Sequence, residues 1–232
     1  MNKITISENK TLKYHIVVYT LIFTVGFFGG FSFLEKSFSS LLDSIRISEW
    51  INAKQILYLM LFAYAVIIFF PILLKDIKAL NKNVLNEIST VLFVVVILSA
   101  LIKLLFGGIS INSNLSETVN GYIAFDGIIK VILIFPIIEE LYCRYSITYL
   151  IKKYIYDNNY LCILISAIIF SVFHYKNLIG KDLNIICYYI LVYLILGVGC
   201  SYLYLYTNNI MSSIILHMIW NASMVAGAFL FH

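Results

Sequence analysis

Long apolar runs constrain this chain more than any other feature of its sequence. The hydrocarbon core of a bilayer is ~30 Å thick and a helix rises ~1.5 Å per residue, so about 20 apolar residues cross it. Segments of about this length or longer lie at 14–34, 54–74, 88–107, 122–156, 160–176, 184–206 and 210–231. An amphipathic eighth helix is predicted at the membrane interface within 35–53.

The composition supports a membrane-embedded chain. Charged residues make up 12% of the sequence and hydrophobic residues 62%, whereas a soluble domain carries about 25% charged residues. The alternation of polar and apolar residues that is typical of strands is absent from the sequence. We therefore predict an all-α, polytopic transmembrane helical bundle with the lipid bilayer as its partner. The net charge of +4 is spread over short connecting segments, so no nucleic-acid partner is expected.

The N-terminus is polar, and the apolar run that follows it is longer than a signal-peptide core. No small-residue cleavage site is evident, so we expect a retained first membrane helix. With the N-terminus inside, the inner segments hold eight lysines and the outer segments hold six Lys or Arg residues. This bias favours a cytoplasmic N-terminus, because loops with more Lys and Arg tend to stay inside.

The fourth apolar segment, 122–156, is too long for one simple span. We expect it either to project from the membrane at Lys152 and Lys153 or to break near Pro136, since proline disrupts the interior of a helix.

This same segment carries three ionisable residues among apolar ones: Glu139, Glu140 and Arg144. One charge at the centre of a membrane helix costs roughly 2.5–3.5 kcal/mol on insertion scales. Glu140 and Arg144 are four residues apart, so they share a helix face and are predicted to pair. Glu139 is rotated about 100° from Glu140 and needs another partner.

The next apolar segment offers that partner. If the two helices form a hairpin that turns near Asp157, Glu139 lies 18 residues before the turn and His174 lies 17 after it. Antiparallel helices of equal rise then bring Glu139 and His174 to the same depth. The last segment adds His217 and Asn221, which are four residues apart and share a face. Together these residues predict a polar site inside the bundle rather than scattered structural polar groups.

Three motifs in this order resemble a known family. EExxxR begins at Glu139, FxxxH runs from Phe170 to His174, and HxxxN runs from His217 to Asn221. Residues 120–231 thereby resemble the CAAX-protease and bacteriocin-processing (Abi) family of intramembrane endopeptidases. The resemblance implies a helical protease whose site lies in a water-accessible cavity.

The family's substrates range from prenylated CAAX proteins to bacterial peptides, and its bacterial members are linked to bacteriocin immunity and to maturation of signalling peptides. The short chain fits a bacterial plasma-membrane member. We expect one structural domain, made of about three N-terminal helices in 1–120 and catalytic helices in 121–232.

Peptide hydrolysis needs an activated water, a proton donor for the leaving amine and stabilisation of the oxyanion. No Ser or Cys lies beside the histidines in a nucleophile-like motif, which disfavours a covalent route. We expect Glu139 to act as general base, assisted by His174, and His217 and Asn221 to bind the oxyanion. The expected supporting residues are Glu140, Arg144 and Phe170.

A metal route uses the same side chains. Glu139, His174 and His217 could hold Zn²⁺ with an open position for water, although the HExxH signature is missing. Two further alternatives are a proton-coupled transporter that relays ions through the carboxylates and a non-catalytic immunity or scaffold protein. A membrane-associated peptide or protein is the expected substrate, but the sequence does not name it.

Overall fold

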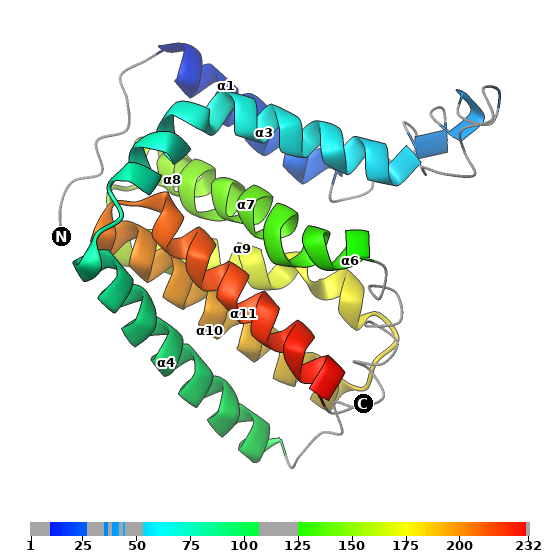
Figure 1. Ribbon diagram of the computed structural model, residues 1–232, viewed down its shortest axis with the longest axis vertical. Helices are drawn as coiled ribbons and strands as arrows, with labels where there is room; N and C mark the ends of the chain where they lie inside the picture. Colours follow the sequence, from blue (N-terminus) through cyan, green and yellow to red (C-terminus); the bar gives the residue numbers. More distant parts are fainter. Residues whose placement is uncertain are drawn as a thin grey trace. The chain divides into compact units, whose positions relative to one another are not determined.

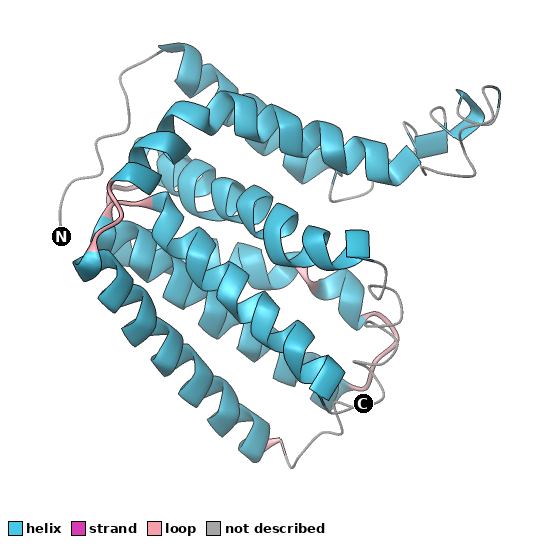
Figure 2. Cartoon of the chain, in the orientation of Figure 1, coloured by secondary structure: helices cyan, strands magenta, loops and turns pink. Residues whose placement is uncertain are grey.

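The computed structural model describes residues 10–26, 35–36, 39–41, 44, 53–106 and 125–230. These residues are almost entirely helical, and no strand occurs among them (Figure 2). The described parts of the seven predicted apolar segments are almost entirely helical. The prediction of an all-α membrane bundle is confirmed, whereas most of the predicted helix in 35–53 lies outside the described residues.

The described helices also confirm the membrane assignment. Four of them are long and apolar enough to cross a bilayer: Ile56–Lys78, Lys82–Leu105, Leu183–Thr207 and Ile210–Gly227. Their exposed side chains are largely apolar, as expected for surfaces that face lipid.

The chain divides into two compact units, and the smaller one spans Ile6–Leu74. It contains α1 (Lys10–Val25) and most of α3 (Ala53–Lys78). The two helices are joined by a hydrogen bond of 2.9 Å between Nδ1 of His15 and the hydroxyl of Tyr64. A polar contact between apolar helices of this kind helps to fix their pairing.

The larger unit contains the chain from Lys75 onward and carries all of the predicted site residues. Its helices are α4 (Lys82–Leu105), α6 (Phe125–Ile129), η2 (Lys130–Ile134), α7 (Phe135–Glu140), η3 (Leu141–Ile147), α8 (Thr148–Tyr154), α9 (Asn159–Phe173), η4 (Tyr175–Leu178), α10 (Leu183–Thr207) and α11 (Ile210–Leu230). In this unit α10 packs against α4, α9 and α11, and α11 packs against η2 and α7 (Figure 1). The helix α4, which begins earlier than residue 88, therefore belongs to the same packed unit as the site.

The fourth segment forms a continuous helical run from α6 to α8, and the predicted break at Pro136 does not occur. Instead, the stretch η2 directly before Pro136 is a π-helix, in which hydrogen bonds span five residues. A proline ring clashes with the carbonyl four residues before it in a regular α-helix. The wider π-helical turn accommodates that ring without ending the helix.

The predicted hairpin turn is confirmed. The helix α8 ends at Tyr154, and Asn158 caps α9 by accepting the backbone N–H of Leu161 on its side-chain oxygen at 3.1 Å. Farther along, α9 approaches α10 closely at Gly197. A Cβ on Gly197 would lie only 3.0–3.2 Å from atoms of Ala167, so the missing side chain lets the two helices pack together.

The turn between α10 and α11 is held by the end of α3. Asn208 closes α10 in the left-handed conformation with φ of 50°, a role to which asparagine is suited. The buried carboxylate of Asp76 accepts the N–H of Ile210 at 2.7 Å, and the Asn209 side chain donates to the Asp76 carbonyl at 2.8 Å. These bonds satisfy groups at the start of α11 that a helix leaves unpaired.

Candidate active site

A fully buried ion pair lies at the centre of the long helical run. Glu140 ends α7 and Arg144 follows one turn later in η3. Nε of Arg144 lies 3.1 Å from Oε2 of Glu140, and both side chains are completely buried. The predicted pairing of these two residues is confirmed. A charge in this position is stabilised only while its partner is present, because removal of one leaves the other uncompensated in an apolar environment.

Glu140 has a second partner that the sequence reasoning missed. Its Oε1 lies 2.9 Å from Nδ1 of His217 on α11. A carboxylate paired with arginine only accepts hydrogen bonds, so Nδ1 of His217 must carry the proton. Glu140 therefore fixes the orientation of His217, as well as neutralising Arg144. The i, i+4 spacing could not reveal this contact, since it depends on how α11 is rotated against α7.

Glu139 differs from Glu140 in being accessible. Its side chain is 26% exposed, whereas that of Glu140 is 0% exposed. Oε2 of Glu139 lies 3.8 Å from Nε2 of His217. The structure thus places His217 between the two carboxylates, with Nδ1 toward Glu140 and Nε2 toward Glu139.

His174 lies at the end of α9, where the helix gives way to η4. Its Nδ1 donates to the carbonyl of Phe170 at 2.9 Å, so Nε2 of the neutral ring is left with a lone pair. Phe170 contacts both His174 and His217, and His217 faces Glu139, so His174 belongs to the same cluster of side chains. A direct meeting of Glu139 and His174 stays a prediction.

The ring of Phe170 lies among these polar groups. Its centroid is 4.8 Å from that of His174 and 5.3 Å from that of His217. The guanidinium carbon of Arg144 lies 4.5 Å from the same centroid, over the ring face. The negative face of an aromatic ring attracts a cation in this position. Phe170 therefore packs against both histidines and shields the buried arginine.

Asn221 is tied to the proline-containing helix. In η2 the N–H of Phe135 donates to the carbonyl five residues earlier, at Lys130. The next carbonyl, that of Val131, would then pair with residue 136, but Pro136 has no N–H. Nδ2 of Asn221 donates to this carbonyl at 2.9 Å. Because an amide nitrogen carries two hydrogens, one remains for a ligand, and the predicted oxyanion role of Asn221 stays a prediction.

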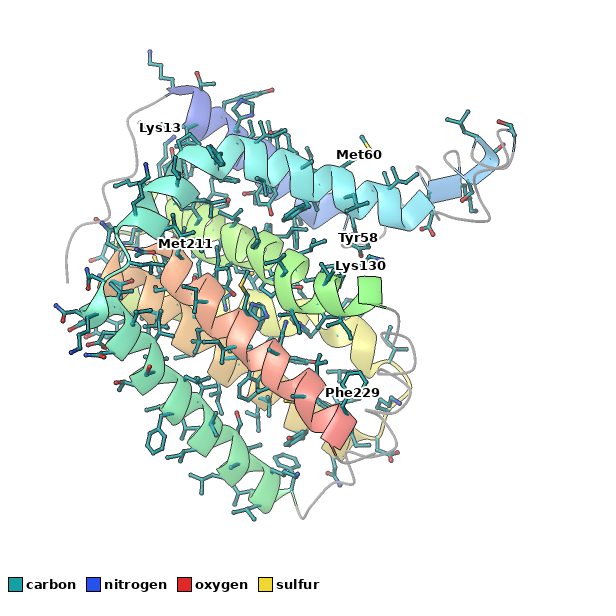
Figure 3. All side chains as sticks on the ribbon, viewed as in Figure 1. Lys13, Tyr58, Met60, Lys130, Met211 and Phe229 are labelled. Atoms are coloured by element: carbon teal, nitrogen blue, oxygen red, sulfur yellow. The ribbon has the colours of Figure 1, made fainter. Side chains whose placement is uncertain are left out.

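Figure 3 shows the side chains on these helices, with Lys130 labelled at the start of η2 and Met211 and Phe229 near the two ends of α11.

Among the described residues, no group of three His, Cys, Asp or Glu side chains is arranged to hold a metal ion. The predicted zinc ligands Glu139, His174 and His217 therefore do not form a ready coordination cluster.

The family comparison agrees with this site. Residues 121–223 match the family model described as type II CAAX prenyl endopeptidase Rce1-like. This segment is similar to the Rce1-like CAAX endopeptidases. The Rce1-like segment contains all three motifs, and the predicted resemblance to CAAX proteases is confirmed. The match supports an intramembrane protease. No curated protein and no solved structure matches the chain.

Proposed function

We propose that this protein is an intramembrane endopeptidase that hydrolyses a peptide bond of a membrane-associated peptide or protein with a water activated by Glu139 and His174. One observation carries the proposal. The partly exposed Glu139 faces His217, which is in turn held by the buried Glu140–Arg144 pair. An accessible carboxylate beside an oriented imidazole is the arrangement that general acid–base chemistry needs.

In the proposed reaction, water between Glu139 and the scissile carbonyl loses a proton to the carboxylate. The neutral Nε2 of His174, whose Nδ1 donates to the Phe170 carbonyl, accepts a hydrogen bond from the same water and orients its lone pair. The hydroxide oxygen bonds to the carbonyl carbon. The proton held by Glu139 then passes to the leaving amine as the peptide bond breaks.

The developing oxyanion needs hydrogen-bond donors. His217 in its protonated form offers Nε2–H, because its Nδ1–H is already committed to Glu140. Asn221 offers the amide hydrogen that it does not donate to Val131. Removal of one oxyanion donor typically lowers kcat by about 10²–10³-fold. In this scheme Glu140 and Arg144 act by holding His217 in place.

We further propose that the protein lies in a bacterial plasma membrane with its N-terminus in the cytoplasm. The inner segments hold more Lys and Arg residues than the outer ones, which supports this orientation. The substrates that suit this setting are leader peptides, signalling peptides and bacteriocin-like peptides.

The proposal is tested by comparing wild type with Glu139→Gln and with the matched control Glu87→Gln on α4. The membrane peptides of cells that express each variant would be measured by mass spectrometry, and cleavage of an enriched candidate would be repeated with purified protein. We expect Glu139→Gln to fold and to lose about 10²–10⁴-fold in rate, and Glu87→Gln to keep wild-type activity.

Equal cleavage by wild type and Glu139→Gln would refute the proposed mechanism. An immunity phenotype that survives Glu139→Gln would instead favour the non-catalytic scaffold, and ion-dependent flux into proteoliposomes would favour the transporter.

A further inference from the structure

The side chain of His174 is held by a hydrogen bond and by aromatic contacts. Its backbone forms the cap after α9, where the α-helix changes into η4. One hydrogen bond, from Nδ1 to the Phe170 carbonyl, holds the ring by an edge. This bond sets which nitrogen carries the proton and restrains the ring plane, because rotation about Cβ–Cγ would move Nδ1 away from the carbonyl. Packing on the ring face adds a second restraint on the same rotation.

Tyr193 on α10 supplies that packing. Its ring centroid lies 4.0 Å from that of His174, with 28° between the planes. Tyr193 is itself stacked on Tyr189 one turn earlier, at 6.2 Å and 28°. Tyr189 contacts Tyr188, which in turn contacts Phe106 at the end of α4. Four aromatic rings thus connect the face of His174 to the rest of the packed unit.

We propose that Tyr193 is a positioning residue that holds the His174 ring in the plane needed to orient the attacking water, an inference that rests on the function proposed above. Phe170 contacts the same imidazole at 4.8 Å and a tilt of 55°. Stacked and tilted contacts together restrict rotation that neither restricts alone.

The ring stack and the positioning role each predict a separate experimental outcome. The ring stack predicts that phenylalanine can replace Tyr193, whereas leucine, which has no aromatic face, cannot. A positioning role predicts a fall in kcat with little change in KM, because the loss is in the alignment of the water and not in substrate binding. A general loss of stability would also lower the apparent kcat at unchanged KM, because it reduces the fraction of folded enzyme, so kcat is expressed per folded enzyme, with the folded fraction taken from thermal unfolding of each variant.

The test compares Tyr193→Leu, Tyr193→Phe and the control Tyr202→Leu in purified protein. Tyr202 lies on the same helix and is likewise stacked on a tyrosine, Tyr206, at 5.4 Å. We expect Tyr193→Leu to lower kcat about two- to tenfold at unchanged KM. Tyr193→Phe and Tyr202→Leu should match wild type in both constants. Equal kcat in wild type and Tyr193→Leu, or an equal fall in the two leucine variants, overturns the positioning role.

A second measurement does not depend on activity. The ring protons of histidine-labelled protein report neighbouring aromatic faces through their NMR shifts. The His174 ring signals should move in Tyr193→Leu and stay in place in Tyr193→Phe. An unchanged His174 spectrum in Tyr193→Leu overturns the placement of Tyr193, whereas a wild-type enzyme that cleaves no peptide overturns the proposed function.

Discussion

The buried ion pair is predicted to contribute strongly to the stability of the folded protein. Both side chains of the Glu140–Arg144 pair are fully buried, with 3.1 Å between Nε and Oε2, and Nη1 of Arg144 has no hydrogen-bond partner among the described residues. Removing one member of such a pair costs about 3–5 kcal/mol. For a chain of 150–250 residues this corresponds to a fall in Tm of roughly 6–20 °C.

The two single variants should differ. After Arg144→Met, Glu140 keeps His217 as a partner at 2.9 Å. After Glu140→Leu, Arg144 loses this carboxylate and keeps neutral contacts, among them the Gly197 carbonyl at 3.4 Å and the face of Phe170. Glu140→Leu is therefore expected to be the more destabilising change. The double variant should recover much of the lost stability, since apolar residues can replace a buried pair without loss. It should still be a poor enzyme, because His217 has lost the carboxylate that orients it.

Thermal unfolding of the purified variants in one detergent measures these effects, with cleavage assayed in parallel. Asp157→Asn is the matched control, because Asp157 pairs with Lys152 at 3.4 Å but is 58% exposed. Exposed pairs contribute about 0–1 kcal/mol, so the Tm should move little. A double variant that loses as much stability as the two single variants combined would contradict this expectation, as would an Asp157→Asn variant whose Tm falls as far as that of Glu140→Leu.

Three more predictions follow from the fold. Gly197→Val should destabilise the protein by about 1–3 kcal/mol because its Cβ would lie 3.0 Å from the Ala167 backbone. Gly227→Ala, which meets no atom within 4 Å and lies inside α11, should instead raise Tm slightly, because alanine favours a helix over glycine; a fall in Tm in both variants would contradict the close approach. Asp76→Ala should cost about 0.5–2 kcal/mol by removing the acceptor for the Ile210 N–H, and hydrogen exchange at the start of α11 should speed up; unchanged exchange would count against this cap. Chelation should leave cleavage intact, because in the proposed mechanism Glu139 and His174 activate the water themselves; loss of activity that zinc restores would show otherwise.

The sequence predicted which residues form helices more reliably than how the helices face one another. Apolar runs and the capping asparagine of α9 determine where helices form from nearby residues alone. The position of the hairpin turn followed from counting residues on either side of it, because both helices rise equally per residue. The Glu140–Arg144 pair was predictable because it lies within one helix. The contact of Glu140 with His217 was not, since it depends on the rotation of α11 about its axis. Tyr193 was missed for the same reason: nothing marks one tyrosine among the many on α10.

The hydrogen bond between Asn221 and Val131 also links two distant sequence positions. Pro136 removes an N–H from its own helix, and the carbonyl left over becomes an acceptor for a neighbouring helix. The Val131 carbonyl therefore needs a hydrogen-bond donor at residue 221 because residue 136 is a proline. A chain with alanine at 136 could close its own helix, and a substitution of Asn221 would then cost less stability than in the natural sequence. The two residues form a dependent pair, in which the proline makes the asparagine structurally necessary.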